Sequence, residues 1–162
     1  MLARAVFPLA VLFILAACGG SKREEPPSTI GVRGEGFAVQ VPRGWTVTRP
    51  PAGVAARHGT GLVSVSVFPL VKPYDPAKFG AAAKELDGVA ARLAKEAGTT
   101  LTRSETVTVG NRKVRAYSYG TSRIAFVLVG KREYQLFCAH TTAACDLLFS
   151  SFTLAGPQAL QL

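Results

Sequence analysis

The residues best suited to chemistry are three cysteines and two histidines. Cys138 and Cys145 lie near the carboxyl end with His140 between them, whereas Cys18 stands alone near the amino end. The close pair of thiols can form a disulfide, or it can join His140 and His58 as ligands of a metal ion. The spacing is not that of a standard zinc knuckle, so we expect no metal. Which chemistry applies depends on the compartment.

The amino terminus predicts that compartment. Residues 1–4 are short and positively charged, and residues 5–17 form an uncharged, mostly aliphatic run that ends in small residues, as in a signal peptide. The run is too short for a stable membrane-spanning helix, since about thirteen residues reach only roughly 20 Å. The sequence Leu15-Ala16-Ala17-Cys18 resembles the bacterial lipobox, in which the cysteine is lipidated and the preceding bond is cut. A plain secretory signal is the alternative.

Lipidation of Cys18 with fatty acyl chains such as palmitate would anchor the protein stably in a membrane. Two or three acyl chains give stable anchoring, whereas a single chain binds the membrane only reversibly. We therefore expect a lipoprotein on the extracytoplasmic side of the cell membrane or outer membrane. Export to an oxidising place favours a disulfide between Cys138 and Cys145 over a metal site.

The remaining chain predicts one domain. Residues 18–35 are rich in Gly, Pro, Ser and charges and read as a lipidated flexible tether, residues 36–156 as the folded domain, and residues 157–162 as a tail.

The spacing of apolar residues gives the expected elements. Alternation predicts three strands before residue 70, and Asp75-Pro76 predicts the start of a helix of about 22 residues that ends near Gly98. From Thr100 onward a meander of four strands follows, with residues 124–129 as a central strand covered on both faces. Residues 143–152 predict a short closing helix.

This order of elements, the sequence GFAVQVPRGW that ends at Trp45, and the ending DLLFSSF that reaches Phe152 resemble the PsbP-like superfamily, which includes LpqN-type bacterial lipoproteins and the Mog protein. The resemblance covers about 115 residues. It implies an α+β fold, an α/β/α sandwich around a twisted, mainly antiparallel sheet of about six to seven strands, with one long helix and a short C-terminal helix. It also implies that Trp45 and Phe152 are core residues, and that the protein binds or assembles without catalysis.

Charge indicates what could be bound. Loss of Arg4 with the signal lowers the net charge from +9 to +8, and residues 99–135 hold seven basic residues against two acidic ones. These residues predict a patch for an anionic partner, or else a solvated face; they are Arg103, Arg112, Lys113, Arg115, Arg123, Lys131 and Arg132. An envelope protein, an anionic polymer or anionic lipid fits the compartment, whereas nucleic acid does not.

The sequence contains no nucleophile elbow, phosphate-binding glycine loop or zinc-protease helix, so we expect neither an enzyme nor a cofactor. Two functions remain. The first is a non-catalytic protein-interaction or assembly module at the cell envelope. The second is a carrier of a small hydrophobic ligand or lipid, with a pocket between sheet and helix walled by Phe79, Leu86 and Leu93.

Overall fold

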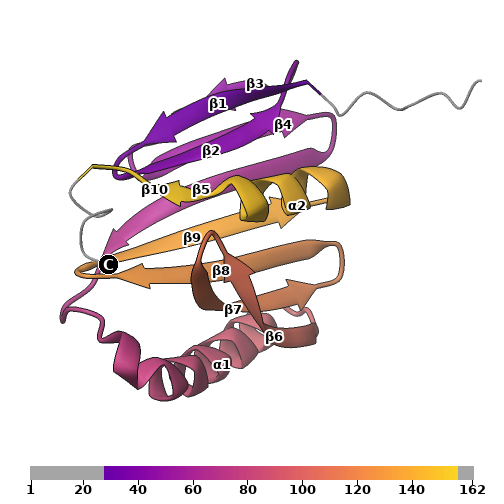
Figure 1. The fold of residues 1–162 in the computed structure, drawn as a ribbon. Helices are drawn as coiled ribbons and strands as arrows, with labels where there is room; N and C mark the ends of the chain where they lie inside the picture. Colours follow the sequence, from indigo (N-terminus) through magenta and orange to yellow (C-terminus); the bar gives the residue numbers. More distant parts are fainter. Residues whose placement is uncertain (1–27, 157–162) are drawn as a thin grey trace, which may run out of the picture.

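A computed structural model describes residues 28–156 of the chain (Figure 1). The described part contains two β-sheets, one long helix and one short helix. In chain order the elements are β1 (Thr29–Gly34), β2 (Phe37–Pro42), β3 (Thr46–Thr48), β4 (Gly53–His58), β5 (Gly61–Pro69), the 3-10 helix η1 (Pro76–Lys78), α1 (Phe79–Glu96), β6 (Leu101–Val109), β7 (Arg112–Tyr119), β8 (Ser122–Val129), β9 (Arg132–Ala139), α2 (Thr142–Ser151) and β10 (Thr153–Leu154).

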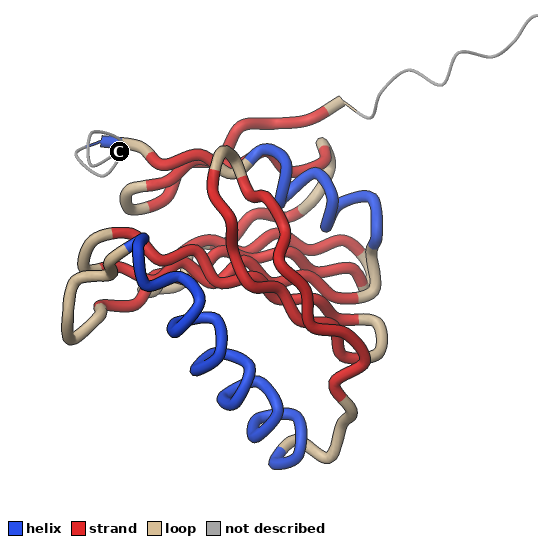
Figure 2. The backbone as a smooth tube through the Cα atoms, turned by 60° about the horizontal axis from the view of Figure 1, so that its bottom comes forward, coloured by secondary structure: helices blue, strands red, loops and turns tan. Residues whose placement is uncertain are grey.

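The larger sheet has seven strands in the order β3-β4-β5-β9-β8-β7-β6, and every neighbouring pair is antiparallel. Figure 2 shows it between two layers: α1 covers one face, and α2 with the smaller sheet covers the other. The expected α+β class and α/β/α sandwich are confirmed, with one long helix and a short C-terminal helix.

The smaller sheet has three strands in the order β1-β2-β10. Strand β1 occupies Thr29–Gly34, so the prediction that residues 18–35 are all tether is wrong for this segment. Ile30 and Val32 alternate with Gly31 and Arg33, and Val32 is buried in the core, which offsets the cost of ordering the strand. Residues 18–27 of the predicted tether and the predicted tail 157–162 lie outside the described residues.

Strand β4 was also not expected, because residues near His58 look like a loop in the sequence. Its Val54 and Ala56 are buried and face the main core, while its other residues are half-buried or exposed. The structure therefore has five strands before the long helix, where the sequence predicted three. The four-strand meander is present, and β8 lies between β7 and β9 with apolar residues on both faces, as predicted.

The main core lies between the larger sheet and the layer formed by α2 and β2. Phe152 is 2% exposed, and its ring centroid lies 6.1 Å from that of Phe37 and 5.6 Å from that of Tyr134. Trp45 is half-buried at the edge of the same core and stacks on His58. Both residues that the resemblance marks as core residues therefore pack against the core.

Helix α1 begins through η1, as the Asp75-Pro76 pair predicts. The carboxylate of Asp75 accepts a hydrogen bond of 3.0 Å from the backbone N–H of Ala77, and Gly98 has a left-handed φ of 63° just after the helix end. The buried residues of α1 are Ala90 and Ala94, whereas Leu93 is 49% exposed. The helix therefore rests on the sheet through small residues and leaves large apolar ones at its margins.

Candidate functional site

Helix α1 is tied to β7 mainly at Asp87, and the hydroxyl of Tyr119 also donates a hydrogen bond of 3.5 Å to the backbone carbonyl of Ala90. The guanidinium of Arg115 donates two hydrogen bonds of 2.9 Å to the carboxylate of Asp87, and the hydroxyl of Tyr117 donates a third of 2.7 Å. Burial tends to raise the pKa of Asp87, but these hydrogen bonds outweigh it and lower that pKa below its usual value. Burial and the hydrogen bond to Asp87 raise the pKa of Tyr117. The contact fixes where α1 crosses the sheet.

Strands β7 and β8 separate at the end of the sheet nearest the start of α1. Within the described residues, their pairing stops at Arg115 opposite Phe126, although β7 begins at Arg112 and β8 continues to Val129. The other ladders run on to the turns, because Val109 pairs with Arg112 and Val129 with Arg132. Two hairpin tips therefore diverge here.

The β6–β7 tip contacts the opposite layer beyond the point where the strands diverge. Figure 1 shows the β6–β7 hairpin tip rising past β8 toward β10 and α2. Gly110 in this turn has a φ of 60°, and a Cβ added there would lie 3.1 Å from the carbonyl oxygen of Phe152. The tip thus packs against the end of the layer that contains α2, and it lies apart from the end of β8.

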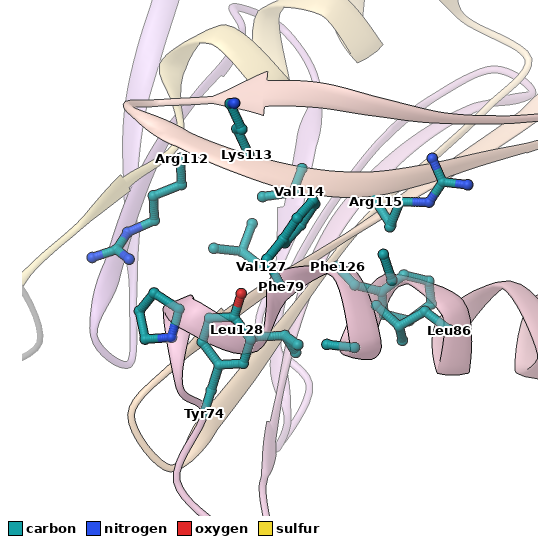
Figure 3. Close-up of a pocket in the computed structure, with 13 residues that line it drawn as sticks. Tyr74, Phe79, Leu86, Arg112, Lys113, Val114, Arg115, Phe126, Val127 and Leu128 are labelled. Carbon is teal, nitrogen blue, oxygen red and sulfur yellow. The ribbon is translucent and has the colours of Figure 1, made fainter.

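A half-open pocket of about 380 Å³ lies in the resulting gap (Figure 3). One wall comes from the segment before α1 and its first turns, including Tyr74, Phe79 and Leu86. The opposite walls are residues 112–115 of β7 and residues 126–128 of β8. The volume falls in the lower part of the range of about 300–1,000 Å³ that is typical of small-molecule sites.

The pocket has a cation at each end, but the guanidinium of Arg115 is already held by Asp87, whereas that of Arg112 is at the other end. In Figure 3 the hydroxyl of Tyr74 and the guanidinium of Arg112 lie on the same side, and Phe126 and Leu86 lie further along. Burial raises the pKa of the Tyr74 hydroxyl, and the positive charge of Arg112 partly offsets that rise. Nη2 of Arg112 is buried and has no hydrogen-bond partner among the described residues.

A second groove of about 350 Å³ runs along the other side of α1. It shares Leu86, Phe126 and Leu128 with the first pocket and adds Leu70 and Leu93. Phe79 and Leu86 therefore line the first pocket, as the sequence suggested, whereas Leu93 lines the neighbouring groove. The pocket predicted between sheet and helix is in fact two adjoining depressions on either side of α1.

The structure does not bring the seven predicted basic residues into one patch. Arg112 and Lys113 lie beside the β6–β7 turn, and Lys131 and Arg132 lie at the β8–β9 turn, which is at the same end of the sheet. Arg103 and Arg123 lie at the opposite end, on the face that carries α2. Binding of an anionic partner stays a prediction, but it applies to two separate ends.

Most of these cations already have acidic neighbours. Arg103 and Arg123 both contact Glu105, at 2.8 and 3.0 Å. Arg132 contacts Glu35 at 2.8 Å, and Arg115 is held by Asp87. Of the seven, Arg112, Lys113 and Lys131 have no ion pair within residues 28–156. Apart from the pair of Arg103 with Glu105, these partners lie 18 or more positions apart in the chain, so a count of charges could not find them.

The disulfide between Cys138 and Cys145 is present, with the two Cα atoms 5.5 Å apart. It joins the end of β9 to the first turn of α2, as predicted, and both cysteines are buried. Because the two sulfurs bond to each other, they are not available as thiolate ligands. His140 beside them has a φ of 55°, and its Nδ1 lies 3.1 Å from the hydroxyl oxygen of Thr121. No metal-binding group of His, Cys, Asp and Glu occurs within the described part of the chain.

The predicted lipidation site Cys18 and the predicted signal peptide, residues 1–17, lie outside the described residues. None of the helices between residues 28 and 156 is both long and apolar enough to span a bilayer.

Comparisons with known proteins give little further information. No family model matches the chain, and no curated protein matches it. Among solved structures, a crystal structure from Bacteroides thetaiotaomicron VPI-5482 at 1.50 Å resolution aligns with a TM-score of 0.49 and 12% identity over 75% of this chain. The match covers 46% of that chain, so the present protein spans about half its length.

Proposed function

We propose that this protein is an extracytoplasmic lipoprotein, anchored through Cys18 to the cell membrane or outer membrane, whose folded part binds a ligand without catalysis. The signal-like residues 1–17 and the lipobox-like sequence that ends at Cys18 support the anchor. The bond between Cys138 and Cys145 is in keeping with an oxidising compartment. The resemblance to the PsbP-like superfamily supports a binding role.

The pocket between α1 and the separated strands favours a small hydrophobic ligand. Its floor is apolar, with Phe79, Leu86 and Phe126 as the largest side chains, and the gap between β7 and β8 leaves one side open. Small-molecule sites combine an apolar lining with a few polar groups of this kind. This pocket is the observation on which the proposed function depends.

Filling the pocket tests the proposal. Ala83 lines the pocket, whereas Ala91 lies on the same helix, is exposed and lines neither depression. We expect native mass spectrometry of the purified mature protein to show a bound apolar molecule, which Ala83→Trp loses and Ala91→Trp retains. A ligand-free mass for the unchanged protein, together with no binding of added aliphatic probes, would contradict ligand binding.

The anchor is tested separately. We expect Cys18→Ser to release the protein from the membrane fraction or to stall its processing, because the acyl chains can no longer be attached. An unchanged membrane fraction would rule out the lipoprotein proposal and leave the ligand pocket untouched.

A protein-interaction or assembly module is the second candidate, favoured by exposed apolar residues beside α1. Leu93 is 49% exposed and lines the second groove with Leu70, and the neighbours of Leu70 include Phe68 and Val71, which are 40% and 98% exposed. Apolar side chains that gather on one face mark interaction surfaces. Cross-linking in intact cells should capture a partner that Leu93→Lys loses and Ala91→Lys retains.

A further inference from the structure

The two ends of the pocket differ in chemistry, and this difference points to the shape of the ligand. Figure 3 shows the guanidinium of Arg112 and the hydroxyl of Tyr74 at one end. The side chains of Phe79, Leu86 and Phe126 continue the pocket toward the middle of α1. A ligand that fits both parts must therefore be polar at one end and apolar along the rest.

Arg112 is the arginine of the lining that forms no ion pair within residues 28–156. Its Nη2 is enclosed by protein and has no hydrogen-bond partner there, so an anion would meet the other nitrogens of the guanidinium. Arg115, the other arginine of the lining, already donates to both carboxylate oxygens of Asp87. An incoming anion therefore binds more favourably to the guanidinium of Arg112 than to that of Arg115, which already has a carboxylate partner.

The surroundings of Arg112 leave room for an anionic group. Asp75, which follows Tyr74, is occupied elsewhere: its carboxylate accepts a hydrogen bond from the backbone N–H of Ala77 and lies 3.9 Å from the ammonium of Lys78. Tyr74 adds a hydroxyl donor, while the ammonium of Lys113, another lining residue, points away from the guanidinium of Arg112 in Figure 3. Charge-assisted hydrogen bonds from such donors to a carboxylate or phosphate are about twice as strong as neutral ones.

We propose that the pocket binds a free single-chain amphiphile with an anionic head, the head at Arg112 and Tyr74 and the chain along Phe79, Leu86 and Phe126. This inference rests on the proposed ligand-binding function and specifies its ligand class. The volume of about 380 Å³ suits one short aliphatic chain and excludes a lipid with two long chains. The source is thus a soluble amphiphile and not the bilayer surface.

The test compares probes that share one chain and differ only in the head. Decanoate, decan-1-ol and decyltrimethylammonium are titrated below their micelle concentrations into the chain from residue 18 onward, with Cys18→Ser so that no acyl group competes. Backbone amide NMR shifts report the binding. We expect decanoate to bind about tenfold more tightly than decan-1-ol, as one charge-assisted contact provides, and the cation to bind least.

Three variants assign the preference to the head site. Arg112→Gln should remove the tenfold preference for decanoate and leave decan-1-ol affinity unchanged. Tyr74→Phe, which keeps the ring, should reduce the preference in part. Lys131→Gln, which removes a nearby exposed cation that lines neither the pocket nor the second groove, should change neither. Thermal unfolding of each variant shows whether it is folded. If Arg112→Gln does not fold, the preference for decanoate is tested with Tyr74→Phe alone.

The outcomes separate the inference from the proposed function. Equal affinity for decanoate and decan-1-ol, or the same effect for Arg112→Gln and Lys131→Gln, would overturn the anionic head while leaving hydrophobic ligand binding intact. Absence of binding by all three probes would overturn both. The protein could instead float with phosphatidylglycerol vesicles in a way that depends on Arg112, without binding decanoate. This result would assign Arg112 to contact with a membrane surface and would overturn the inference.

Discussion

Arg115 and Asp87 are 28 residues apart in the chain, and their side chains form the two-pronged contact that holds α1 on the sheet. The side chain of Arg115 is 15% exposed and that of Asp87 is 41% exposed. The arginine is therefore largely desolvated, while the carboxylate still contacts water. The pocket lies directly beside this contact, so the stability of the helix and the shape of the site depend on the same two residues.

Asp87→Ala should destabilise the fold by roughly 1 kcal/mol, because it leaves the largely buried guanidinium of Arg115 without its acceptor. This value is discounted for the solvent exposure of the carboxylate. Urea unfolding measures the change. Glu96→Ala is the matched control, since Glu96 forms an exposed pair with Arg92 at 3.9 Å on the same helix and its loss should cost less than about 0.5 kcal/mol.

Stability should fall in acid partly through Asp87. Its pKa in the folded protein is lower than the ordinary value of 3.8, so its contribution is present above that pH and is lost as the pH falls toward the folded pKa. The urea midpoint measured from neutral pH down to about pH 3 should decline less steeply in Asp87→Asn than in the unchanged protein. Parallel curves would mean that the contact with Arg115 does not stabilise the charged form.

Tyr117 should govern part of the loss of stability in alkali. Burial and the hydrogen bond to Asp87 raise its pKa above 10.0, so its contribution is complete below that pH and is lost as the pH rises beyond it. Unfolding midpoints measured from about pH 9 to about pH 11 should decline less in Tyr117→Phe. Burial also raises the pKa of Tyr119 and of Tyr134, so some decline should persist in the variant.

The disulfide should stabilise the fold by roughly 2 to 3 kcal/mol, as chain-entropy arguments give for a short loop. The variant that carries both Cys138→Ala and Cys145→Ala should show a loss of this size in urea unfolding. Thiol counting on the unreduced, denatured mature protein should find neither Cys138 nor Cys145 reactive. Two reactive thiols there would contradict the bond.

Phe152→Ala should cost about 3 to 5 kcal/mol, because a fully buried aromatic ring leaves a cavity that its neighbours cannot fill. The backbone carbonyl that Gly110 approaches is kept in this variant, so the β6–β7 tip keeps that contact and ligand binding should persist while the variant is folded. Leu154→Ala, at a half-buried position two residues later, should cost clearly less.

The sequence was a good guide wherever one-faced alternation was strong. Val63 and Val65 marked β5, and the continuous apolar run around Ala125 marked β8 as a central strand. Strand β1 is not evident in the sequence because its alternation offers only two apolar residues, Ile30 and Val32, within a segment rich in Gly and charges. Strand β4 was missed because its buried pair, Val54 and Ala56, is small and is enclosed by glycine and histidine.

The site was less predictable, for a physical reason. The sequence indicated that Phe79 and Leu86 could line a pocket, but the pocket exists because the β7–β8 ladder ends at Arg115. The β6–β7 tip beyond that point lies against the backbone of Phe152 through Gly110, and these two residues are 42 positions apart. The unpartnered state of Arg112 depends on the same three-dimensional arrangement, and a count of charges does not contain it.

The β1–β2 hairpin determines how a mechanical load on the amino-terminal side would reach the domain. Thr29 pairs with Pro42 at the open end of the hairpin, and Gly34 pairs with Phe37 beside its turn. A pull on Thr29 therefore peels the ladder one pair at a time instead of shearing all six pairs together. Under tension this hairpin can unpair first. The pocket belongs to the other, seven-stranded sheet, which keeps its shape.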